Sequence, residues 1–144
     1  MIFNITYNER KIENELIELV GKPFGFFDRI KMGGIGTNKL QILEATKTIA
    51  KCIEGRSVTN YCYLELRPKG LIVGFQSHLK TYAWAIPFHL LHVYYNGGLL
   101  SIYDNKDSVK LGAPFNGKVD KKYLRKILDL KMKYSENLKM REHE

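Results

Sequence analysis

Apolar residues recur at helical spacing near the start of the chain. Residues 9–20 carry four apolar side chains on one side of a helix, with charged residues opposite: Ile12, Leu16, Leu19 and Val20. Thr6 and Glu9 fit a capping box, and Gly21 followed by Pro23 supplies a stop. The pattern predicts a helix over 9–20.

A second helical pattern covers residues 38–54, after a short aromatic segment and a glycine-rich stretch. Its apolar positions recur on one face: Ile42, Ala45, Ile49 and Ile53. Asn38 suits a cap, and Gly55 follows the last apolar position as a helix-ending residue. We therefore expect two helices before any sheet.

The apolar period changes to two at Asn60, as a half-buried strand requires. Five further short strands follow, joined by turns, near residues 71–75, 79–86, 91–95, 99–103 and 109–111. The dipeptide Asn96-Gly97 favours a two-residue hairpin turn in which both residues have positive φ. Short turns join antiparallel neighbours, so the segment predicts a meander of about six strands.

The last pattern runs from Asp120, the expected cap, to about Tyr134. Its apolar face is broad and needs a packing partner, which the sheet can supply: Tyr123, Leu124, Ile127, Leu128 and Leu130. The predicted fold is α+β, a curved antiparallel sheet or partly open barrel closed by this amphipathic helix, with two N-terminal helices. We expect one domain over 1–134 and a polar tail over 135–144.

Composition narrows the class of protein. With 44% hydrophobic residues and 17 aromatics, 144 residues can bury one core without disulfides or a structural metal. The start MIFNITYNER lacks the basic and apolar parts of a secretory signal, and residues 83–95 are too interrupted to span a bilayer. We therefore expect an intracellular, cytoplasmic protein without a transmembrane segment.

Positive charge is concentrated in one segment. The net charge is +8, and residues 118–134 hold seven Lys or Arg against two Asp, so they supply five of the eight charges. Six cations fall opposite the apolar face and should point to solvent: Lys118, Lys121, Lys122, Arg125, Lys126 and Lys133. The stripe is either a solvated helix face or an anion-binding surface.

Two motifs are considered as sites for a nucleotide or a metal ion. Gly33 to Gly36 lies between a possible strand and a helix, where backbone amides can cradle phosphate, but it completes neither GxGxxG nor a Walker motif. His89 and His92 form HxxH, yet their spacing on a strand directs them to opposite faces. We expect a flexible connector at the glycines, one surface and one partly buried histidine, and no metal or cofactor.

The two cysteines, Cys52 and Cys62, form no CxxC pair and favour buried thiols over a disulfide or zinc site. Cys62 shares a strand face with Leu64 and Leu66, which disfavours a catalytic nucleophile. The residues give no positive indication of catalysis.

The short strands, Ile86-Pro87 entering a mid-sheet strand and the closing helix together resemble bacterial pleckstrin-homology-like domains over residues 58–134. The stretches LELRPKGLIVGFQ and TYAWAIPF also resemble small uncharacterised bacterial proteins. In pleckstrin-homology domains that bind phosphoinositides, basic residues around the first hairpin hold the phosphates. The resemblance thus implies anion-binding roles for Arg67 and Lys69 at a comparable turn, and for Lys80 near the next.

The leading hypothesis is a non-catalytic binding or scaffolding module that recognises a protein or an acidic ligand, with nucleic acid and anionic lipid among the possible anions. The alternative is an enzyme or small-ligand carrier with a pocket between helices and sheet, lined by Phe24, Phe26, Tyr82 and Trp84. Pairing of the acidic first helix with the basic last helix would give a homodimer.

Overall fold

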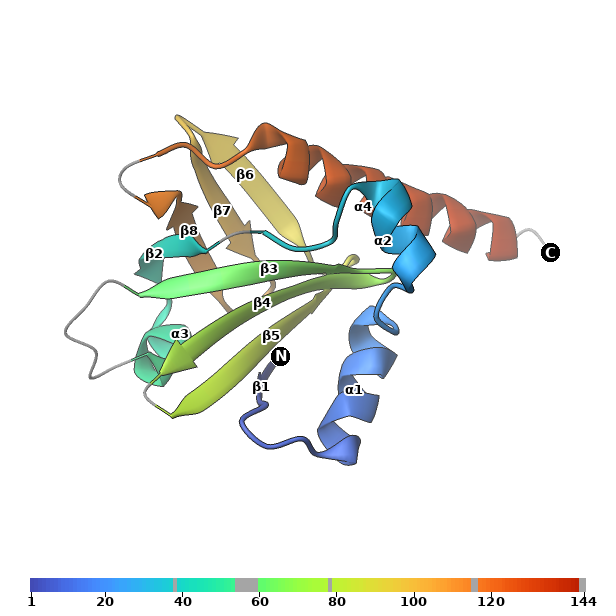
Figure 1. Ribbon diagram of the computed structural model, residues 1–144. Helices are drawn as coiled ribbons and strands as arrows, with labels where there is room; N and C mark the ends of the chain where they lie inside the picture. The colour runs from blue at the N-terminus through green and yellow to red at the C-terminus, as the bar shows by residue number, and fades with distance from the viewer. Residues whose placement is uncertain (38, 54–59, 78, 115–116, 143–144) are drawn as a thin grey trace.

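One antiparallel sheet organises the fold (Figure 1). The computed structural model describes residues 1–37, 39–53, 60–77, 79–114 and 117–142, and these ranges contain eight strands in the order β1-β5-β4-β3-β2-β8-β7-β6. The strands are β1 (Ile2–Asn4), β2 (Leu40–Ala45), β3 (Tyr61–Arg67), β4 (Gly70–Ser77), β5 (Lys80–Pro87), β6 (His92–Asn96), β7 (Leu99–Tyr103) and β8 (Ser108–Gly112). The helices are α1 (Arg10–Val20), α2 (Phe26–Met32), α3 (Lys47–Cys52) and α4 (Lys121–Glu142).

The α+β class, the antiparallel sheet and the C-terminal helix are confirmed, and the sheet is unclosed. The expected six strands from residue 60 are all present as β3 to β8. The total of about six is wrong, because the described residues add β1 and β2 before them.

The main core lies inside the curve of the sheet. Side chains from distant strands form a single cluster with α4, including Leu64 on β3, Trp84 on β5, Leu111 on β8 and Ile127 on α4, all fully buried. Residues so far apart in strand order share one core only if the sheet bends around it. The predicted packing of the last helix against the sheet is therefore confirmed.

A second, smaller cluster covers the outer face of β4 and β5. Leu16 and Val20 of α1 pack there against Phe3, Ile72 and Ala85. The predicted helix over 9–20 is confirmed, and Gly21 ends it with φ +90°. The capping box is wrong, because Glu9 is the N-cap without a side-chain hydrogen bond and Thr6 Oγ1 instead accepts from the amide of Thr81.

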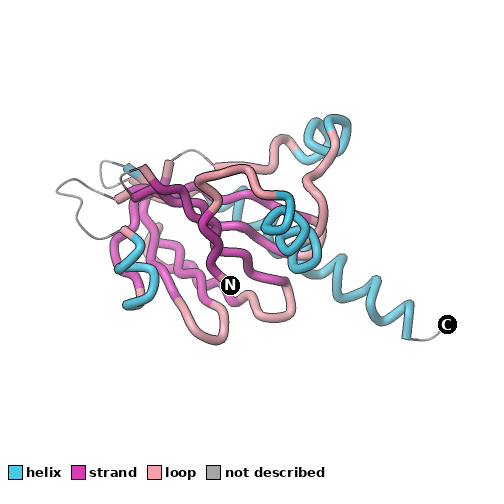
Figure 2. The backbone as a smooth tube through the Cα atoms, turned by 90° about the horizontal axis from the view of Figure 1, so that it is seen from below, coloured by secondary structure: helices cyan, strands magenta, loops and turns pink. Residues whose placement is uncertain are grey.

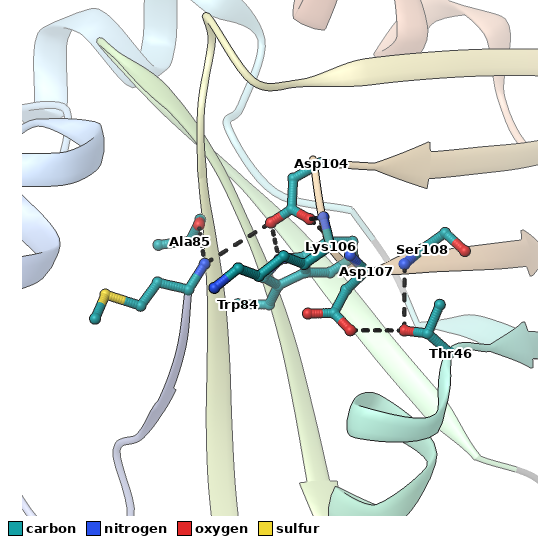
Figure 3. A network of polar contacts seen from close by, with 8 residues as sticks. Thr46, Trp84, Ala85, Asp104, Lys106, Asp107 and Ser108 are labelled. Atoms are coloured by element: carbon teal, nitrogen blue, oxygen red, sulfur yellow. Dashed lines mark hydrogen bonds and ion pairs between the residues drawn. The ribbon is translucent and has the colours of Figure 1, made fainter.

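A polar network joins β5 to the turn between β7 and β8 (Figure 3). The indole Nε1 of Trp84 donates to Oδ2 of Asp104 at 3.0 Å, and the amides of Lys106 and Asp107 donate to Oδ1. The amino group of Met1 lies 3.8 Å from the same carboxylate. Side chains therefore link two parts of the sheet whose strands do not pair directly with each other.

Residues 38–54 were expected to form one helix, and this is wrong. The chain forms β2 over 40–45 and only then the short helix α3. Leu40 and Ile42 point into the core, and a β-bulge between Ile42 and Glu44 shifts the phase of the strand. Because of the bulge, Ala45 packs against the same core as Ile42, and this three-residue spacing also fits a helix. Asn38, Glu54 and Gly55 lie outside the described residues.

The hairpin of β6 and β7 has the predicted two-residue turn, shifted by one position. Asn96 pairs with Leu99, so the turn residues are Gly97 and Gly98, with φ of 61° and 84°. A side chain on Gly98 would also collide with Lys118, which packs against it.

The closing helix α4 is longer than predicted and continues from Tyr134 to Glu142 (Figure 1). Tyr123 and Ile127 are buried as expected, whereas Leu128 is 43% exposed. The aromatic segment before the glycines, expected as a possible strand, is the helix α2.

The polar network yields a prediction about stability. Asp104→Ala should lower the free energy of unfolding by roughly 1–3 kcal/mol, because the buried indole N–H and two amides lose their acceptor. Urea denaturation followed by the fluorescence of Trp84, the single tryptophan, measures the change. Asp28→Ala, at an exposed aspartate of α2, is the control and should change stability by less than about 0.5 kcal/mol.

The same substitution has a pH signature. Burial opposes ionisation of Asp104, but hydrogen bonds from Asp107, Lys106 and Trp84 outweigh it and hold its pKa below the ordinary value of 3.8. A lowered folded-state pKa stabilises the fold above pH 3.8, and this contribution is lost as the pH falls through the folded-state value. The difference between wild type and Asp104→Ala should therefore shrink in acid, and a difference that stays constant would contradict this role.

Candidate functional site

A groove with a volume of about 480 Å³ opens beside the first turns of α4. Its walls come from the segment between α2 and β2, from the end of β8 onward, and from α4 itself. The lining side chains include four lysines and one aspartate: Lys39, Lys118, Lys122, Lys126 and Asp120. We call this site the basic groove, since these five side chains carry a net charge of three.

Helix α4 holds one wall of the basic groove in place. Lys126 Nζ donates to the carbonyl oxygens of Gly33 and Gly34 at 3.0 and 3.3 Å, and Tyr123 Oη donates to Ile35 O at 2.8 Å. Burial, with a smaller contribution from Glu65, raises the pKa of Tyr123 far above its usual value, so its hydroxyl stays protonated and remains a donor. The wall and the helix therefore form one unit.

The start of α4 is fixed as firmly as the wall it holds. Asp120 Oδ1 accepts from the amide of Lys122 at 2.9 Å, as predicted for a cap. The amide of Val119 donates to Gly98 O at 2.9 Å, and Tyr95 Oη donates to Val119 O at 2.8 Å. These bonds attach the residue before α4 to β6 and its hairpin. They therefore fix the backbone that carries Lys118 and Lys122.

The predicted cations of the helix divide into two groups. Lys118 and Lys122 are exposed and line the basic groove, together with Lys126. Lys121 lies over the ring of Tyr95, 5.7 Å from its centroid, and Arg125 is exposed on the helix. The expectation that Lys126 faces solvent holds only in part, because its side chain is half-buried and its ammonium group binds backbone carbonyls.

The hairpin cations are not brought together with the helix cations. Arg67 is paired with Glu65 and donates from Nη1 to Gly21 O at 2.8 Å, so its side chain fixes the end of α1. Lys69 and Lys80 are exposed at opposite ends of β4, in the turn before it and at the residue that opens β5.

Lys39 belongs to the basic groove and was missed from the sequence. Its Nζ lies 5.5 Å from the centroid of the Tyr61 ring, and Leu40 beside it points into the core. Reading residues 38–54 as a strand would have placed Lys39 and Leu40 on opposite faces. Its proximity to α4 depends on the fold and has no signature in local spacing.

The glycine segment has a different role from the phosphate cradle considered above. The amides of Gly33 and Gly34 donate to the end of α2, and the amide of Thr37 donates to Leu64 O. The carbonyls of Gly33, Gly34 and Ile35 meet donors from α4. The segment follows a helix and leads to a strand, and these bonds fix it between α4 and β3 instead of leaving it a flexible connector.

Comparisons with protein-family models, with curated proteins and with solved structures found no match to this chain. In the ranges that the structure describes, no helix is long and apolar enough to cross a membrane.

The histidines and cysteines differ in part from expectation. His89 lies in the turn before β6 and is exposed, and His92 on β6 is exposed as well, so a partly buried histidine is wrong. Among the described side chains, no group of three or more His, Cys, Asp or Glu is arranged to hold a metal ion. Cys62 is buried as predicted, whereas Cys52 is only half-buried.

Of the four aromatic residues proposed to line one pocket, three belong to or pack against the main core and Phe26 does not. Trp84 is fully buried in the core, and Phe26 is 72% exposed on α2. Tyr82 stacks on Phe75 with 5.6 Å between ring centroids, and Phe24 packs against the main core. The pocket proposed for an enzyme or carrier is therefore not formed by these residues.

The environment of the thiols predicts their reactivity. Burial raises the pKa of Cys62 to about 12, so its reactive thiolate is scarce at neutral pH. Iodoacetamide should modify the half-buried Cys52 first and leave Cys62 intact in the native protein, while both should react in urea. Mass spectrometry of labelled peptides distinguishes the two sites, and equal native labelling rates would contradict the predicted burial of Cys62.

Proposed function

We propose that this protein is a non-catalytic binding module that recognises an acidic ligand in the basic groove. The observation that carries the proposal is the convergence of Lys39, Lys118 and Lys122 on one concave surface beside Lys126. The lysines come from two segments far apart in the sequence, so their meeting is a product of the fold. Asp120 supplies one negative charge in the lining but uses Oδ1 to cap α4.

The rigidity of the groove supports binding. Tyr123 and Lys126 hold one wall, and the bonds from Val119 and Tyr95 hold the start of α4. A pre-ordered site loses little conformational freedom when a ligand binds, which favours affinity. Ammonium groups make charge-assisted hydrogen bonds to phosphate or carboxylate oxygens, so ligands with several such groups fit this site best.

A pleckstrin-homology-like arrangement is part of the proposal. The curved antiparallel sheet and the C-terminal helix support it. Within this arrangement, the anion site lies at the helix instead of at the first hairpin, because Arg67 is bound to Glu65 and Gly21.

Titration with inorganic tripolyphosphate by isothermal calorimetry tests the proposed site. Wild type should bind, and the double variant Lys118→Glu with Lys122→Glu should lose at least about tenfold in affinity, since each charge-assisted hydrogen bond is worth roughly 1.5–3 kcal/mol. Both side chains are exposed, so the fold should be retained in the variant.

The matched control is Lys133→Glu with Lys139→Glu, which makes the same change of charge on α4 outside the lining of the basic groove. The control should bind within about threefold of wild type, because these two exposed charges lie outside the groove and salt screens their effect on the ligand. Equal losses in the two double variants would mean that affinity follows net charge alone, and would contradict a specific groove.

A further inference from the structure

Helix α2 exposes an unusual amount of apolar surface for its length. Phe26, Phe27 and Ile30 are 72%, 79% and 63% exposed, and the two phenylalanine rings pack edge to face with centroids 5.8 Å apart. None of the residues in this helix is buried. Large exposed apolar side chains that cluster in this way are typical of a surface that binds another protein or a membrane.

The exposed helix is fixed at its C-terminal end. Its C-cap Gly33 adopts φ +71°, and the amides of Gly33 and Gly34 donate to Ile30 O and Arg29 O. Lys126 of α4 binds the carbonyls of the same two glycines. Met32, the last residue of the helix, packs against the main core. The apolar residues are therefore presented by a fixed helix, which stands clear of the sheet at the upper right of Figure 2.

The order of residues around α2 separates apolar from charged positions. Successive residues turn by about 100°, so Phe26, Ile30 and Phe27 occupy one arc of about 100°. Arg29 and Lys31 border this arc on its two sides, and Asp28 lies opposite. An apolar edge bordered by cations on both sides is typical of helices that lie in the interface of an anionic bilayer.

We propose that α2 docks on an anionic lipid surface, with Phe26, Phe27 and Ile30 inserted at the level of the headgroups. Arg29 and Lys31 then meet lipid phosphates on either side, and Lys22, exposed just before the helix, adds a third cation. A bilayer fits this projecting convex helix because a fluid surface needs no complementary hollow. The helix lies outside residues 58–134, and the docking is independent of the basic groove.

Vesicle flotation tests this docking. Phosphatidylcholine vesicles are compared with vesicles that also contain phosphatidylglycerol, and wild type should float mainly with the anionic set. Phe26→Ser with Phe27→Ser should reduce the partition coefficient at least about tenfold, because insertion removes two large apolar side chains from water. Arg29→Gln with Lys31→Gln should weaken binding most at low salt, since its effect is electrostatic.

Leu79→Ser is the matched control, because Leu79 is 92% exposed in the turn between β4 and β5, away from α2. It should float as wild type does, and circular dichroism melts verify that every variant is folded. Failure of wild type to float, or equal flotation of the phenylalanine variant and the Leu79 control, would overturn the proposal. Loss of self-association in the phenylalanine variant without any change in flotation would also overturn it, and would assign the helix to a second copy of this chain.

Discussion

The hydrogen bond from the indole of Trp84 to Asp104 joins two regions of the sheet that have no backbone pairing with each other. β5 and β8 are separated by β4, β3 and β2, yet Trp84 on β5 reaches the turn that leads into β8. Amides of its own turn also donate to Asp104 and stabilise its charged form. The contact therefore links two parts of the curved sheet through side chains, while the strand order itself stays unclosed.

Both candidate surfaces depend on this curvature. The bend creates the cavity that Tyr123 and Ile127 of α4 fill, and the position of α4 in turn determines where Tyr123 and Lys126 meet the glycine segment. That junction forms a wall of the basic groove on one side and anchors the end of α2 on the other. A single helix thus positions the basic groove and the exposed helix α2 relative to the same sheet.

Most of the fold was predictable because strands β3 to β8 and helices α1 and α4 have clear apolar periods. The failure at β2 has a physical cause. Its bulge turns Ala45 toward the core that Ile42 enters three residues earlier, and a helix would give the same three-residue spacing of core positions. The candidate site was predictable only in part. Charge placement identified Lys118, Lys122 and Lys126, but the participation of Lys39 and the bonding of Arg67 to Gly21 depend on contacts between distant residues. Periodicity describes which face a residue occupies, and it says nothing of what the fold brings opposite that face.

Nuclear magnetic resonance of the Trp84 indole proton tests the central contact most directly, because the chain has a single tryptophan and the resonance is unambiguous. A buried indole N–H bound to Asp104 should exchange slowly with solvent and show nuclear Overhauser effects to the amide protons of Lys106 and Asp107. An indole proton that exchanges as fast as that of free tryptophan, with no such effects, would contradict the contact between β5 and the turn before β8.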